Sequence, residues 1–115
     1  MTTLTHKWIP QFENLYQASS NGSIVSFRYR KPRPLKQYLK RGYYYVDLYK
    51  DNTRHTFRVN RLILLTFVGN PPHSGHVSCH INGDPLDNRL DNLRWASQSD
   101  NEMDKQRSQW QKKEQ

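Results

Sequence analysis

Residues 77 to 101 read VSCHINGDPLDNRLDNLRWASQSDN, and this stretch predicts two short strands joined by a turn and followed by a helix. The first strand is expected from Val77 to Ile81, and Asn82-Gly83-Asp84-Pro85 has the composition of a tight turn. Residues 92 to 96 then form a second strand or an extended segment. Ser97 and Asp100 are spaced as the N-cap and the third residue of a helix that runs into the C-terminal tail.

The sequence upstream of this stretch predicts a small antiparallel sheet and one buried helix. A turn at Ser19-Ser20-Asn21-Gly22 precedes a short strand over residues 23 to 26. Residues 43 to 50, YYYVDLYK, favour a strand that pairs with residues 55 to 59 across an Asp51-Asn52 turn. Residues 60 to 67, NRLILLTF, suit a short buried helix, although periodicity alone also permits a strand. The predicted fold class is therefore α+β.

The chain carries 18 Lys and Arg residues against 10 Asp and Glu residues, a net charge of +8 in 115 residues. This balance favours a polyanionic partner, because bound cationic side chains displace condensed counterions from phosphates. The segment from residue 28 to 41 concentrates the excess, contains no acidic residue and is interleaved with tyrosines. We expect nucleic acid rather than a membrane surface, since the segment is not an amphipathic basic helix. The residues predicted to contact nucleic acid are Arg28, Arg30, Lys31, Arg33, Lys36, Lys40 and Arg41, together with Arg94.

Cysteine use and hydropathy bear on the compartment. The single cysteine, Cys79, excludes an internal disulfide and favours a reducing environment. Apolar runs of transmembrane length are absent from the sequence, and the N-terminal residues lack the apolar core of a signal peptide. We therefore expect an intracellular, cytoplasmic protein with no membrane partner.

One imidazole and two carboxamides recur at a spacing that suits a compact metal-dependent nuclease site. Phosphodiester hydrolysis needs an activated water, and a neutral histidine can take the proton of that water near neutral pH. A divalent cation can stabilise the departing oxygen, and Mg²⁺ keeps several waters, so few protein ligands suffice. His80 would then be the base, and Asn101 would offer its carboxamide oxygen to the metal. Asn92 would hold either the loop or the imidazole in place.

The same residues also suit an ordinary polar turn, and short motifs of this kind often arise without function. Asp84 and Asp87 are more easily explained as turn-stabilising residues than as metal ligands. A structural zinc site is not expected, because zinc usually takes separated pairs of ligands. The candidate zinc ligands all fall within residues 73 to 80, namely His73, His76, Cys79 and His80.

The stretch from Val77 to Asn101 resembles the HNH nuclease motif of phage and intron-encoded endonucleases. That motif has a His near a strand end, a G-x-x-x-x-N loop, an N-L-x-W segment and a later helical Asn. Residues 56 to 67, TFRVNRLILLTF, resemble the segment that precedes the HNH core. Residues 8 to 26 are similar to a separate N-terminal module of these enzymes, called NUMOD4. The matching positions are Trp8, Ile9, Phe12, Glu13, Tyr16, Ser19, Asn21, Gly22, Val25 and Ser26.

The resemblance implies a small N-terminal antiparallel sheet followed by a ββα-metal (His-Me finger) core. It places a NUMOD4-like module over residues 1 to 59 and an HNH core with a basic helical tail over residues 60 to 115, in one compact unit. The implied activity is divalent-metal-dependent cleavage of double-stranded DNA, with Mg²⁺ or Mn²⁺ and with a monomer or homodimer as the active form.

Carried over by position, His80 is the general base, Asn92 steadies the loop and Asn101 is a metal ligand. The family commonly has a second metal ligand directly before the catalytic His, and this chain has Cys79 there. A thiolate suits softer metals than Mg²⁺. This departure keeps open the alternative of a DNA-binding protein with a degenerate, inactive HNH site.

Overall fold

The computed structural model describes residues 4 to 97. The N-terminal part forms a sheet in the order β1 (His6–Trp8), β2 (Tyr16–Ser19), β3 (Ile24–Ser26) and β4 (Arg33–Pro34), and all neighbouring strands are antiparallel. The predicted strand over residues 23 to 26 is thus confirmed as β3. Its partner β2 is buried, because Tyr16 and Ala18 enter the core from this strand.

A second antiparallel sheet consists of β5 (Tyr38–Lys40), β6 (Tyr43–Lys50) and β7 (Thr53–Arg58). Strands β6 and β7 form the expected hairpin. Its turn residues Asp51 and Asn52 have φ angles of 53° and 61°, the left-handed pair that a two-residue hairpin turn requires. Asn and Asp tolerate this conformation better than most residues, which explains the local signal in the sequence.

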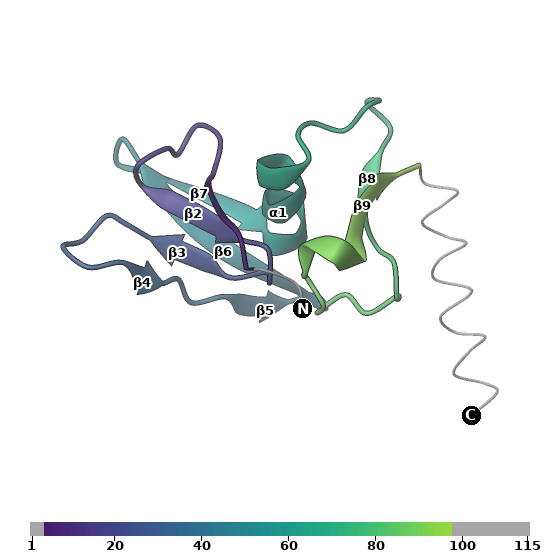
Figure 1. Cartoon of the computed structure of the whole chain (residues 1–115), viewed down its shortest axis with the longest axis horizontal. Helices are drawn as coiled ribbons and strands as arrows, with labels where there is room; N and C mark the ends of the chain where they lie inside the picture. Colours follow the sequence, from purple (N-terminus) through teal and green to yellow (C-terminus); the bar gives the residue numbers. More distant parts are fainter. Residues whose placement is uncertain (1–3, 98–115) are drawn as a thin grey trace.

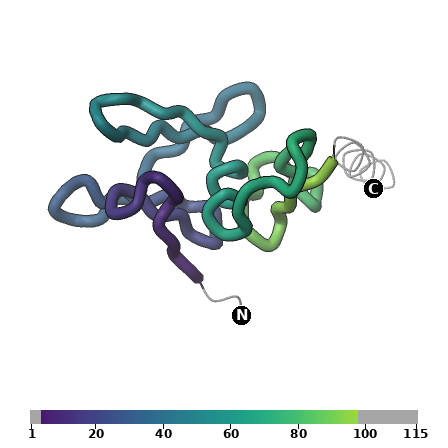
Figure 2. Tube along the Cα trace, turned by 90° about the horizontal axis from the view of Figure 1, so that it is seen from above, coloured from purple at the N-terminus to yellow at the C-terminus, as the bar shows by residue number. Residues whose placement is uncertain are grey.

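Helix α1 (Val59–Phe67) follows β7 without a loop and confirms the predicted buried helix. Its apolar face contains Val59, Leu62 and Ile63, all at most 1% exposed. Figure 1 shows α1 between the two sheets on one side and the C-terminal hairpin on the other, and the orthogonal view in Figure 2 agrees. The core that surrounds α1 draws buried residues from β2, β3, β6 and β9. Within residues 4–97, no helix is long and apolar enough to cross a membrane.

The C-terminal hairpin comprises β8 (Val77–His80), a short 3₁₀ turn η1 (Leu90–Asn92) and β9 (Leu93–Ala96). His80 pairs with Leu93 at one end of the ladder, and Val77 pairs with Ala96 at the other. The predicted strands are one residue too long at the loop end, since Ile81 leaves β8 and Asn92 belongs to η1. The helix predicted after Ser97 lies outside the described residues, and Asn101 lies there too.

The loop between β8 and β9 also touches the N-terminal sheet. The amide of Leu90 donates a hydrogen bond of 2.8 Å to the carbonyl of Ser20 in the β2–β3 turn. Gly22 in the same turn has φ +96°, and a Cβ atom there would lie 3.0 Å from the carbonyl oxygen of Asn88. This close approach fixes the loop against a turn that is distant in sequence.

This approach predicts that Gly22→Ala destabilises the fold more than Gly42→Ala does. Both glycines have positive φ, but a Cβ on Gly42 would meet nothing within 4 Å. The control variant should therefore show only the backbone cost of about 1–2 kcal/mol. Gly22→Ala should cost about 1–3 kcal/mol more, because the Asn88 backbone must move. Equal midpoints in urea unfolding for the two variants would contradict this contact.

Candidate active site

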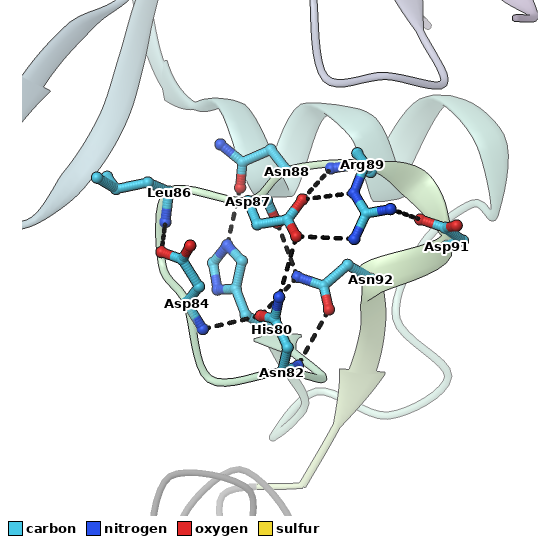
Figure 3. A network of polar contacts seen from close by, with 9 residues as sticks. All are labelled: His80, Asn82, Asp84, Leu86, Asp87, Asn88, Arg89, Asp91 and Asn92. Carbon is cyan, nitrogen blue, oxygen red and sulfur yellow. Dashed lines mark hydrogen bonds and ion pairs between the residues drawn. The ribbon is translucent and has the colours of Figure 1, made fainter. Parts of the chain in front are cut away.

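His80 lies at the end of β8 and is 8% exposed. Its Nε2 atom is 2.8 Å from the Oδ1 atom of Asn88, which is also buried (Figure 3). A carboxamide oxygen only accepts hydrogen bonds, so Nε2 carries the proton and donates it. The neutral ring then has its lone pair on Nδ1, which makes no hydrogen bond within residues 4–97. This tautomer presents Nδ1 as a base.

The surroundings of His80 keep the ring neutral near pH 7. Burial is the main cause, and it lowers the pKa of His80 below the ordinary value of 6.5 because a charged imidazole loses hydration. The hydrogen bond to Asn88 and the carboxylates of Asp84 and Asp87 oppose this shift. The positive charge of Arg58 adds to it.

Asn92 holds the loop rather than the imidazole. Its Oδ1 accepts a hydrogen bond from the amide of Asn82, and its Nδ2 donates to Oδ1 of Asn82 and to the carbonyl of Asp87, with lengths of 2.9 to 3.0 Å. The carbonyl of Asn92 accepts from the amide of Ile81 at 2.8 Å. These four bonds tie both ends of the loop together, and Figure 3 shows those made by the Asn92 side chain.

The imidazole is instead oriented by Asn88, which the sequence reasoning did not assign a role. Asn88 is the final residue of the G-x-x-x-x-N pattern that begins at Gly83, so a signal for it was present in the sequence. That pattern does not reveal which of two nearby asparagines reaches the ring. Which asparagine contacts the His80 ring depends on the path of the loop. Bonds from Asn92 and from the β2–β3 turn together fix that path.

The two loop aspartates are occupied by bonds within the loop. Asp87 accepts two 2.9 Å hydrogen bonds from the Arg89 guanidinium, and this pairing lowers the pKa of Asp87 to about 2. Asn82 donates a further bond to the same carboxylate. Asp84 accepts from the amide of Leu86 at 3.0 Å. These contacts agree with the turn-stabilising interpretation of both residues.

His80 also lines a cleft of about 780 Å³ between the β6–β7 hairpin and the C-terminal hairpin. The lining contains two arginines, two tyrosines and no acidic residue. The first turn of α1 begins at this cleft and also lacks an acidic residue. The cleft is therefore electropositive beside the neutral imidazole of His80. The lining residues are Tyr43, Tyr45, Thr56, Phe57, Arg58, Arg61, Val77, Ser78, His80, Gly83 and Pro85.

The described residues do not by themselves form a metal centre. No group of three or more His, Cys, Asp or Glu side chains within residues 4–97 is placed to hold an ion. Cys79 is 1% exposed and is a soft donor, so it does not fit a hydrated Mg²⁺ ion. The predicted ligand Asn101 lies outside the described residues. His73 and His76 lie with their rings 5.2 Å apart, without a third ligand in the described part of the chain.

The basic residues predicted to bind nucleic acid are all exposed. Arg33 lies over Tyr29 at 4.9 Å and Lys40 over Tyr45 at 5.8 Å, so the interleaved tyrosines contact the cations. The β3–β4 loop lies at the end of the molecule far from the β8–β9 hairpin (Figure 1). Lys40 lies near the cleft, because its ammonium group contacts Tyr45, which lines the cleft. Arg94 is exposed on β9.

Two family models match this chain. Residues 57 to 103 match the HNH endonuclease model, and residues 7 to 49 match the NUMOD4 motif. The first match covers α1 and the whole C-terminal hairpin, and the second covers the N-terminal sheet except for His6, and β5 and β6 except for Lys50.

Similar proteins carry endonuclease names. The chain is 37% identical over 97 residues to "Uncharacterized HNH endonuclease L245" of Acanthamoeba polyphaga mimivirus, covering 83% of this chain and 28% of that protein. It is 34% identical over 96 residues to DNA endonuclease I-HmuI of Bacillus phage SP01, covering 83% of this chain and 53% of that protein. The chain thus spans only about a quarter to a half of these relatives.

A solved structure of the HNH homing endonuclease I-HmuI, described as showing DNA binding and cleavage, has a similar fold. The TM-score is 0.76 at 29% identity, over 92% of this chain and 59% of that chain. The expected α+β fold is therefore confirmed.

The site geometry predicts that His80 titrates below pH 6.5, with the proton of the neutral ring on Nε2. Because folding lowers this pKa, stability should fall as the pH decreases from 6.5 toward the lowered value, where the unfolded chain binds a proton first. Asn88→Asp should raise the pKa, since a carboxylate beside Nε2 favours the imidazolium. Nitrogen-detected NMR titration of both proteins measures the pKa and the tautomer. A neutral ring protonated on Nδ1 would contradict the role of Asn88.

Proposed function

We propose that this chain, which belongs to the HNH endonucleases and carries a NUMOD4 motif before its HNH domain, hydrolyses phosphodiester bonds of double-stranded DNA. The observation that carries the proposal is the buried, neutral His80, with its Nε2 proton held by Asn88, at the wall of an electropositive cleft. The names of the relatives support the same reaction class.

In this proposal, Nδ1 of His80 removes a proton from a water molecule as that water attacks phosphorus. The bond from phosphorus to the 3′ oxygen breaks, and this oxygen takes a proton from solvent, leaving a 5′-phosphate and a 3′-hydroxyl. The imidazolium that forms still donates its Nε2 proton to Asn88 Oδ1, which stabilises the charge. Asn92 keeps the loop in the shape that places Asn88 at the ring.

We further propose that the reaction depends on a divalent metal, Mg²⁺ or Mn²⁺, with Asn101 as an oxygen ligand. A bound cation would supply charge stabilisation for the departing oxygen. Cys79 is the second proposed ligand by position, and a thiolate there would shift the preference toward softer metals. Its burial leaves little room for a hydrated ion.

The DNA is proposed to lie along the exposed basic segment as well as in the cleft. Lys and Arg contacts to phosphates would position the duplex without reading its sequence. The proposed contacts are Arg28, Arg30, Lys31, Arg33, Lys36, Lys40, Arg41 and Arg94. A supercoiled plasmid substrate distinguishes nicking by a monomer from double-strand cutting by a homodimer.

The buried Cys79 favours a second candidate function, a DNA-binding protein whose HNH site no longer cuts. Binding of plasmid without nicking in Mg²⁺, Mn²⁺ and Zn²⁺ would support this alternative and contradict the first.

His80→Ala should lower plasmid cleavage at least about 100-fold, because general base catalysis contributes that much or more. DNA affinity should stay within about threefold, since the base carries no charge in the ground state. His6→Ala, an exposed histidine on β1, is the matched control and should cleave like the parent protein. Parental cleavage by a clean preparation of His80→Ala would exclude His80 as the base.

Cys79→Asp should raise Mg²⁺-supported cleavage relative to Mn²⁺-supported cleavage, if residue 79 is a metal ligand. A carboxylate is a hard donor that suits Mg²⁺, whereas a thiolate does not. Cys79→Ala serves as the control for lost volume, because residue 79 is buried. The measurement is the plasmid cleavage rate of each variant in Mg²⁺ and in Mn²⁺. Urea unfolding midpoints show whether each variant is folded, so that a changed rate ratio reports on metal binding by residue 79. An unchanged metal ratio in a folded Cys79→Asp variant would leave Cys79 as a core residue only.

A further inference from the structure

We propose that Arg58 binds a phosphate of the DNA strand that His80 attacks, and that Tyr43 sets the spacing between this arginine and the base. The inference rests on the proposed nuclease function and assigns a residue outside the predicted basic segment. Arg58 is the last residue of β7, and Tyr43 is the first residue of β6. Both line the cleft together with His80.

The side chain of Arg58 is held in place by two tyrosines. Its Nε donates a hydrogen bond of 3.1 Å to the hydroxyl of Tyr45. Its guanidinium carbon lies 4.2 Å from the ring centre of Tyr43 and 5.9 Å from that of Tyr45. Stacking and hydrogen bonding restrict a side chain that otherwise loses much rotamer entropy when it binds. The arginine is therefore oriented before any ligand arrives.

The outer end of this arginine is available to an anion. The Nη1 and Nη2 atoms carry four N–H groups, and these form a fork that matches the oxygens of a phosphate. Within residues 4–97, Asp87 and Asp91 pair with Arg89, and Arg58 forms no ion pair with a carboxylate of this part of the chain. The residue is exposed on its strand.

Tyr43 packs near both the guanidinium of Arg58 and the imidazole of His80. The ring of Tyr43 packs against the guanidinium of Arg58, and its centre is 6.3 Å from the ring centre of His80. Arg58 is close enough to His80 for its charge to lower the pKa of the imidazole. A strand that places one phosphate at His80 thus has a phosphate oxygen or a neighbouring phosphate within reach of Arg58.

The chemistry of the cleft favours a nucleic acid strand over a protein ligand. Its lining has two arginines and no acidic residue, which suits a repeating anion. Tyrosine and arginine faces also suit the sugars and phosphates of a strand. The second arginine, Arg61, lies over Trp95 at 5.5 Å and extends the positive lining toward β9.

The test compares Arg58→Gln with Arg54→Gln. Arg54 lies on the same strand and, by the two-residue period of a strand, on the same face, but it does not line the cleft. Both variants are made with and without His80→Ala, so binding is measured without cutting. A fluorescent duplex titrated at several salt concentrations gives the slope of log affinity against log salt. Plasmid nicking at saturating protein gives the single-turnover rate, and circular dichroism checks that each variant is folded.

Arg58→Gln should reduce the magnitude of the salt slope by about one, the value for one lost phosphate contact. It should also lower the single-turnover rate at least about tenfold, because the scissile phosphate loses its orientation. Arg58→Lys should recover the slope but only part of the rate, since an ammonium lacks the fork. Arg54→Gln should leave both unchanged.

A parental slope and rate in folded Arg58→Gln would overturn the proposal, and so would equal effects of Arg54→Gln. If the parent protein does not cut DNA, the proposed nuclease function fails, yet the salt slope in the His80→Ala background still decides whether Arg58 binds a phosphate. Failure of the two ideas is therefore distinguishable.

Discussion

The hydrogen bond from His80 to Asn88 is the interaction on which the site depends. It selects the tautomer of a buried imidazole and thereby decides which nitrogen can act as a base. The loop that brings Asn88 to the ring is closed by the four hydrogen bonds of Asn92 and by the Asp87–Arg89 pair. A buried polar network of this kind is specific when all its members are satisfied, and costly when one is lost.

The loop that carries Asn88 is also supported from outside the HNH match. Leu90 donates to the Ser20 carbonyl, and the backbone of Gly22 approaches that of Asn88 so closely that a side chain would not fit without movement. Both contacts come from the turn of the N-terminal sheet. Helix α1 strengthens the connection, because it contacts strands of the N-terminal sheet and of the C-terminal hairpin around a shared core. The N-terminal part thus supports the loop that brings Asn88 to His80, and it also carries exposed basic side chains.

Local signals were enough to predict the β6–β7 hairpin and α1. The Asp51-Asn52 turn requires a left-handed backbone, which these two residue types tolerate. The apolar run of residues 60 to 67 is stable only when it is buried in the core. Strand β1 escaped prediction, because three exposed residues become a strand only by pairing with β2. Residue type and spacing predicted His80 as the base, which stays a prediction, and left open whether Asn92 holds the loop or the imidazole. The structure shows the side chain of Asn92 bonded within the loop. The contact of Asn88 with the ring was not predictable, because it depends on a turn that is far away in sequence.

The charges around His80 suit its proposed role as a base, which must be neutral before the reaction and must then hold the proton that it accepts from water. Before DNA binds, burial and the positive Arg58 keep the imidazole neutral, which is the form that can accept a proton. A phosphate in the cleft would bring negative charge next to the ring and would offset the charge of Arg58. Both changes would favour the imidazolium that the proposed proton transfer from water would form. Arg58 would therefore bind the phosphate of the substrate. Once that phosphate offsets its charge, Arg58 would no longer disfavour protonation of His80. A cleft lined with carboxylates would raise the pKa of the ring in the absence of DNA, and would repel the phosphate as well.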